Sequence, residues 1–139
     1  MDFSQFDARQ AADGGFWFQV KHPQTGALLD NDGTPCRVNM LGAEGREAQR
    51  RIADVKAKHP FNKNETPEQS HKRQVAILAC LINEFEGIER NGAKATKNDA
   101  EWFLDLQLPG QDKTGLSFFE QCDTASVNHT NYLGKSEGS

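Results

Sequence analysis

The spacing of apolar residues predicts strands in the first part of the chain. Between residues 16 and 22, aromatic and aliphatic side chains alternate with other residues, which is the two-residue period of a strand. Two shorter apolar runs, residues 27–29 and 36–40, each follow a turn rich in Gly, Asn, Asp or Pro. Three strands in succession predict a small antiparallel meander, with a hairpin between the first two runs.

Beyond residue 42 the apolar residues recur at helical spacing and predict two helices. The first covers residues 43–58 and ends before Pro60, because a proline disfavours helical geometry at the residue before it. The second starts at Thr66, where Gln69 completes the signature of a capping box. Its apolar stripe continues to Phe85, so this helix is expected in the centre of the core.

The C-terminal part predicts a short extended piece and two further helices. Residues 87–92 end on an Asn-Gly turn, a helix over residues 98–106 can be capped by Thr96 or Asn98, and a final helix spans about 115–132. The sequence therefore predicts an α+β fold, with a small antiparallel sheet of about three strands in the N-terminal third packed by about four helices. Residues 1–133 are expected to form one domain, and residues 134–139 a flexible tail.

Composition and charge narrow the class of protein. A chain of 139 residues with 36% hydrophobic residues fits one globular domain. The net charge of -4 disfavours nonspecific binding to nucleic acid, which depends on Lys and Arg neutralising phosphates. No apolar run is long enough to span a bilayer and no signal peptide is recognisable, so we expect a protein that is neither exported nor membrane-bound. Three widely spaced cysteines fit reduced, buried thiols.

Candidate chemistry for catalysis or metal binding is weak throughout the sequence. The four histidines lie far apart, and none has a second His or Cys at a ligand spacing. No phosphate-binding glycine loop is present. The acidic turn at residues 30–33 lacks the glutamate that closes a calcium loop, because Leu41 occupies that position. We therefore expect no catalytic, cofactor or metal site, and the sequence favours a protein that binds other proteins.

Four residues are the candidates for contact with a partner. Arg46 and Arg50 belong to a basic cluster on the helix over residues 43–58. Pairing with acidic residues of the same helix explains most of that cluster. The alternative is that the cluster docks an acidic partner. Trp102 and Phe119 are chosen as aromatic anchors, because the chain has more aromatic side chains than a small core needs.

The order of several motifs resembles that of a known protein family. An aromatic strand leads into a His-Pro-x-Thr-Gly turn at residues 22–26, and a Pro-Cys-Arg-Val strand at residues 35–38 precedes a charged helix. Further on, Asn91-Gly92 precedes a short helix, and the closing segment runs from Phe118-Phe119-Glu120-Gln121 to Asn131-Tyr132-Leu133. This order resembles the tail assembly chaperones of long-tailed bacteriophages over about residues 15–133.

The resemblance implies a non-enzymatic protein of the host cytoplasm. It implies binding to the tape measure protein, whose apolar helices are kept soluble, and recruitment of tail tube subunits without retention in the virion. One alternative is a minor structural protein of the phage, for tail or neck completion. The others are an adaptor or inhibitor that binds a host protein, and an enzyme or nucleic-acid binder of unrecognised type. Self-association is left open by the sequence.

Overall fold

The fold is built on a three-stranded antiparallel sheet. The computed structural model describes residues 3, 12–106 and 116–128. Strand β4 (Arg37–Met40) lies in the centre of the sheet, between β1 (Phe16–Gln19) and β5 (Ile82–Glu86). Two small hairpins form separate two-stranded sheets: β2 (Asp30–Asn31) pairs with β3 (Thr34–Pro35), and β6 (Glu89–Arg90) pairs with β7 (Ala93–Lys94).

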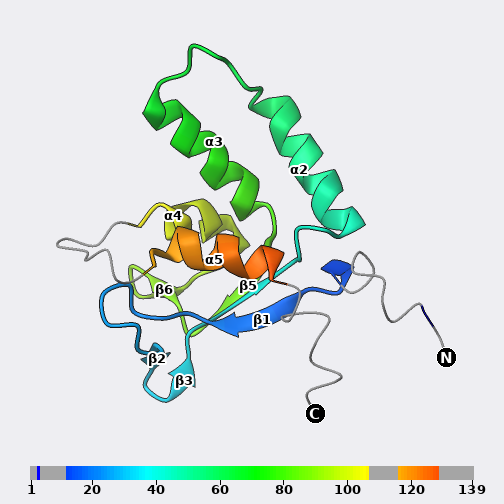
Figure 1. Cartoon of the computed structure of the whole chain (residues 1–139). Helices are drawn as coiled ribbons and strands as arrows, with labels where there is room; N and C mark the ends of the chain where they lie inside the picture. The colour runs from blue at the N-terminus through cyan, green and yellow to red at the C-terminus, as the bar shows by residue number, and fades with distance from the viewer. Residues whose placement is uncertain (1–2, 4–11, 107–115, 129–139) are drawn as a thin grey trace.

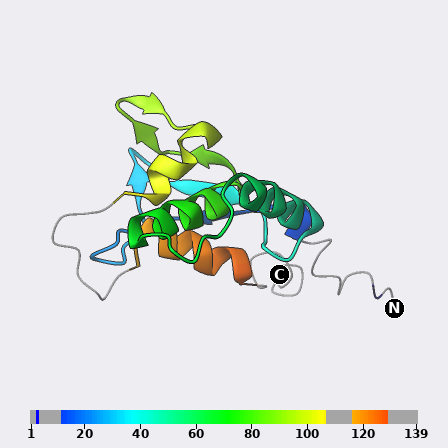
Figure 2. The same ribbon diagram turned by 90° about the horizontal axis from the view of Figure 1, so that it is seen from above.

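Four α-helices of the described residues pack with this sheet. They are α2 (Arg46–Lys58), α3 (Pro67–Ala79), α4 (Ala100–Leu104) and α5 (Phe118–Val127), and a single 3-10 turn at Lys97–Asp99 precedes α4. Helices α2 and α3 form a hairpin whose loop lies at the end farthest from the sheet (Figure 1). Helix α3 contacts both α4 and α5 and lies above them in Figure 1; seen from above it projects between them (Figure 2). The predicted α+β class is confirmed.

The order of strand pairing differs in part from the predicted meander. The first strand pairs along its length with β4, from Phe16 opposite Met40 to Gln19 opposite Arg37. The predicted hairpin with residues 27–29 is reduced to an isolated antiparallel bridge between Lys21 and Leu28. The chain then forms the β2–β3 hairpin before it enters β4, so the third predicted strand occupies the centre of the sheet.

The predicted extension of the second helix to Phe85 is wrong. Helix α3 ends at Ala79, and the following residues form β5. This strand contains an irregularity: Ile82 pairs with Met40 and Glu84 pairs with Asn39, which leaves Asn83 as the extra residue of a β-bulge. The bulge places Ile82 and Phe85 on the same buried side, three residues apart, and that spacing imitates the period of a helix.

One face of the sheet forms the core with α4 and α5. Phe85 of β5 is 2% exposed, and its ring centroid lies 5.1 Å from that of Phe103 in α4. The Phe103 ring stacks in turn on Phe118 of α5, with centroids 4.9 Å apart. This series of aromatic contacts joins the sheet to both helices.

The other face of the sheet carries polar side chains. Arg37 forms two hydrogen bonds of 2.9 Å with the carboxylate of Glu86 on the neighbouring strand, and its guanidinium lies 4.6 Å from the centroid of the Trp17 ring. The sheet therefore has one apolar and one polar face, as an antiparallel sheet packed on a single side requires. The predicted tail at residues 134–139, and the part of the last predicted helix beyond residue 128, lie outside the described residues.

Candidate partner-binding surface

Helix α3 lies at the centre of the candidate surface. Its start is fixed by a capping box: the Thr66 hydroxyl accepts a hydrogen bond from the backbone N–H of Gln69, and the Gln69 side chain accepts one from the backbone N–H of Thr66. In its second half, Val75 and Leu78 are buried, whereas Ala76 and Ile77 are half-buried. The core covers only part of this apolar half, and its two sides line two grooves.

The first groove lies between α3 and α4, and we call it the Trp102 groove. It has a volume of about 360 Å³. Trp102 is half-buried, and the guanidinium of Arg90 lies 5.1 Å from the centroid of its ring. The groove therefore combines an apolar lining with charged groups. Its lining residues are Val75, Ala76 and Trp102, together with His59, Lys72, Glu101 and Asp105.

The second groove lies on the other side of α3, next to α5, and we call it the Phe119 groove. It has a volume of about 340 Å³. Phe119 is half-buried, with its ring centroid 6.2 Å from that of His71, and Val127 is 57% exposed at the end of α5. This groove is more apolar than the first, because Asp123 is its one charged lining residue among those described. Its apolar lining comprises Ala43, Ile52, Ile77, Leu78, Leu81, Phe119 and Val127.

The two aromatic residues chosen from the sequence therefore line different grooves. Trp102 and Phe119 both pack against the core with part of their surface and leave the rest accessible. Half-buried aromatic side chains that line a groove are suited to anchoring an apolar partner. Their role in binding stays a prediction.

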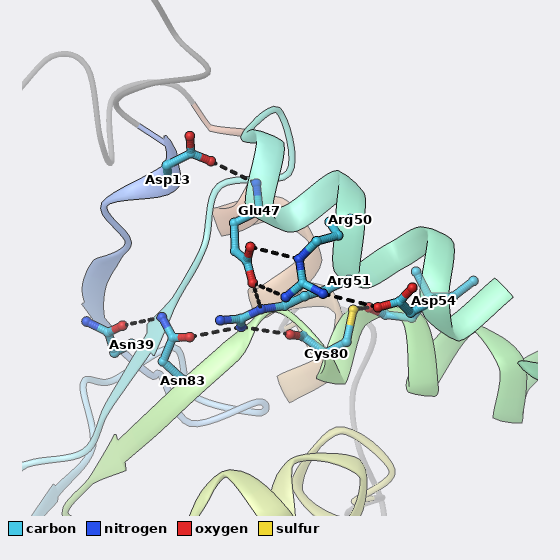
Figure 3. A network of polar contacts seen from close by, with 9 residues as sticks. Asp13, Asn39, Glu47, Arg50, Arg51, Asp54, Cys80 and Asn83 are labelled. Carbon is cyan, nitrogen blue, oxygen red and sulfur yellow. Dashed lines mark hydrogen bonds and ion pairs between the residues drawn. The ribbon is translucent and has the colours of Figure 1, made fainter. Parts of the chain in front are cut away.

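The predicted basic candidates Arg46 and Arg50 lie on α2, away from both grooves. Arg50 binds the carboxylates of Glu47 and Asp54 on its own helix (Figure 3). Hydrogen bonds from Arg50 and Arg51 lower the pKa of Glu47 from 4.5 to about 2. Arg46 is exposed, and within the described part of the chain it forms no ion pair. Ion pairs within α2 thus account for the charge of the Arg50 side chain. Docking of a partner through either arginine stays a prediction.

Arg51, a further member of the basic cluster, connects α2 to the sheet. Its Nη1 donates hydrogen bonds to the backbone carbonyl of Cys80, at 3.1 Å, and to Oδ1 of Asn83, at 3.0 Å. Asn83 in turn donates a hydrogen bond of 2.9 Å to the side chain of Asn39 on β4 (Figure 3). At the start of α2, the backbone N–H of Glu47 donates to Asp13. These contacts hold the α2–α3 hairpin in a fixed position next to the strands.

The described residues form no metal centre, and their thiols lack the lowered pKa of a reactive cysteine. No three of their His, Cys, Asp and Glu side chains are placed to hold a metal ion. The three cysteines are free; burial raises the pKa of Cys80 to about 11 and also raises the pKa values of Cys36 and Cys122. Within the same part of the chain, no helix is both long and apolar enough to cross a bilayer.

Comparisons with known protein families, with curated proteins and with solved structures found no match for this chain. The functional argument therefore depends on the two grooves beside α3 and on the sequence motifs described above.

Proposed function

We propose that this protein is a non-enzymatic tail assembly chaperone of a long-tailed bacteriophage. In this proposal it binds the tape measure protein in the host cytoplasm and helps to recruit tail tube subunits. The observation that carries the proposal is the pair of grooves on the two sides of α3, each lined by one half-buried aromatic side chain. The sequence motifs that resemble this family supply the identity of the partners.

The apolar lining of the two grooves supports the binding of a helical client. An amphipathic helix binds a groove by laying its apolar stripe against apolar lining residues at intervals of three or four positions. The grooves have volumes of about 360 and 340 Å³, so contact with one segment of a client buries a modest area, which suits a partner that must be released during assembly. Two grooves on one helix also allow two client segments, or two different proteins, to bind at once.

The proposal is tested by expressing the tagged protein together with the tape measure protein and the tail tube protein of the same phage. We expect the tape measure protein to become soluble and to co-purify with the tagged chain. Mass spectrometry of purified virions should not find the chain. Its presence in virions would favour a minor structural protein of the tail or neck, and capture of host proteins alone would favour an adaptor or inhibitor.

Variants of the two grooves separate binding from folding. Trp102→Ala and Phe119→Ala are expected to reduce recovery of the client while the melting temperature shows that the domain still folds. Phe61→Ala is the matched control, because Phe61 is 70% exposed and lines neither groove. If the two groove variants recover as much client as the control does, the client binds elsewhere.

A further inference from the structure

The Trp102 groove continues into a neighbouring hollow of about 360 Å³. The two share three lining residues, His59, Ala76 and Glu101, so they form one continuous surface between α2, α3 and α4. We call this surface the extended Trp102 groove. The neighbouring hollow adds two lysines to the lining, Lys58 from the end of α2 and Lys97 from the 3-10 turn before α4.

Positive charge predominates among the free ionic groups of the extended Trp102 groove. The lining has three lysines against two carboxylates, Glu101 and Asp105, and the 2.8 Å contact of Asp105 with His71 leaves the carboxylate charge in place unless the imidazole is protonated. Lys58, Lys72 and Lys97 form no ion pair with any described residue, and Glu101 is the one described carboxylate of the lining that is likewise unpaired. The whole chain has a net charge of -4, so this concentration of unpaired lysines is a local property of the groove.

We propose that the extended Trp102 groove binds an amphipathic helix of a partner protein whose apolar stripe is flanked by acidic side chains. The apolar stripe packs against Val75, Ala76 and Trp102, and the acidic side chains pair with the lysines at the edges of the groove. The proposal rests on the proposed function and deepens it, because it assigns one surface and one chemistry to the client segment.

Charge complementarity decides which kind of helix this surface selects. The three lysines come from three different elements, α2, α3 and the 3-10 turn, so positive charge reaches the groove from each of them. Acidic flanks are attracted there and basic flanks are repelled, and such complementarity contributes to specificity and to the rate of association more than to raw affinity. Because the lysines are exposed, the attraction weakens as salt screens the charges.

The test uses the fluorescence of Trp102 in the full-length chain. Trp17→Phe removes the other tryptophan, and the ring that remains can still pack beside Arg37. The probes are two synthetic helical peptides with the same leucine stripe, one flanked by glutamates and the other by lysines. We expect the glutamate peptide to shift the Trp102 emission and to bind about tenfold or more tightly than the lysine peptide at low salt, with the difference shrinking as salt rises.

A charge-reversed variant shows whether the groove itself causes this preference. Lys58→Glu combined with Lys72→Glu is expected to reverse it, so that the lysine peptide binds more tightly. The matched control is Lys56→Glu combined with Lys63→Glu, which makes the same change in net charge at exposed lysines that do not line the groove. The control should still prefer the glutamate peptide.

Several outcomes overturn the inference. They are equal affinity for the two peptides, an unchanged preference in the Lys58/Lys72 variant, or a single-stranded oligonucleotide that binds the groove more tightly than the glutamate peptide. If the tape measure protein co-purifies but the peptides show no preference, the inference fails and the chaperone proposal stands. If the peptides behave as expected but no tape measure protein is recovered, the groove chemistry stands and the chaperone proposal fails.

Discussion

Arg51 Nη1 lies 3.0 Å from Oδ1 of Asn83 and joins α2 to the bulge of β5 across 32 positions of sequence. The same nitrogen donates to the backbone carbonyl of Cys80, just after the end of α3. Arg51→Leu removes a charged donor from both acceptors, so we expect the free energy of unfolding to fall by about 1–3 kcal/mol. Urea denaturation followed by circular dichroism measures this loss.

Arg50→Leu on the same helix is the matched control for Arg51. The Arg50 side chain is 62% exposed, and its recorded ion pairs involve Glu47 and Asp54 of its own helix. Exposed pairs of this kind are screened by solvent and contribute little, so we expect a clearly smaller loss than in Arg51→Leu. Equal losses in the two variants would show that the contact with β5 does not stabilise the fold.

These contacts also show which parts of the fold could be predicted from the sequence and which could not. The start of α3 was predictable because a capping box uses residues three positions apart, Thr66 and Gln69, and the structure confirms it. Strand β5 was not predictable in this way. Asn83 fits the strand as a bulge because of partners far away in sequence, Asn39 and Arg51, and the bulge gives the strand a helix-like spacing of apolar residues.

The candidate surface was predictable only in part, for a similar reason. Residue type alone was enough to choose Trp102 and Phe119, but the grooves that they line exist because α2, α3, α4 and α5 pack together. The unpaired lysines of the extended Trp102 groove come from separate elements, so no short sequence motif contains them. Arg46 and Arg50 form a visible cluster in the sequence, yet they lie away from both grooves.

The capping box of α3 makes a measurable contribution to stability. Thr66→Ala removes the hydroxyl that accepts the hydrogen bond from the Gln69 N–H, and we expect the free energy of unfolding to fall by about 1 kcal/mol. Thr66→Ser keeps the acceptor and should stay close to the wild-type value. Thermal or urea denaturation distinguishes them, and a serine variant as unstable as the alanine variant would show that the hydroxyl is not the cause.

The Glu47 carboxylate makes stability depend on pH. Hydrogen bonds from Arg50 and then Arg51 hold its pKa at about 2 in the folded protein, against an ordinary value of 4.5. Between these values the unfolded chain binds more protons than the folded one, so stability rises with pH. The contribution of Glu47 is therefore complete above pH 4.5 and is lost as the pH falls towards 2.

Replacement of Glu47 by glutamine tests this dependence directly. We expect the slope of unfolding free energy against pH, measured by urea denaturation between pH 2.5 and 4.5, to decrease by up to about one proton in Glu47→Gln. The carboxylates of Glu65 and Glu86 also have lowered pKa values, because each is hydrogen-bonded to an arginine, so part of the slope should remain. An unchanged slope would mean that the arginines do not hold the Glu47 carboxylate in solution.

Cys122 provides a probe of whether the core opens in solution. Its side chain is completely buried in α5 against the core, and burial raises the pKa of the thiol. A thiol reagent reacts with the thiolate and must reach the sulfur, so we expect Cys122 to be labelled only when the domain unfolds. Mass spectrometry of the labelled protein across a urea titration should show Cys122 following the unfolding curve, and the half-buried Cys36 reacting earlier. Labelling of both cysteines at similar rates without urea would show that α5 leaves the core in the native state.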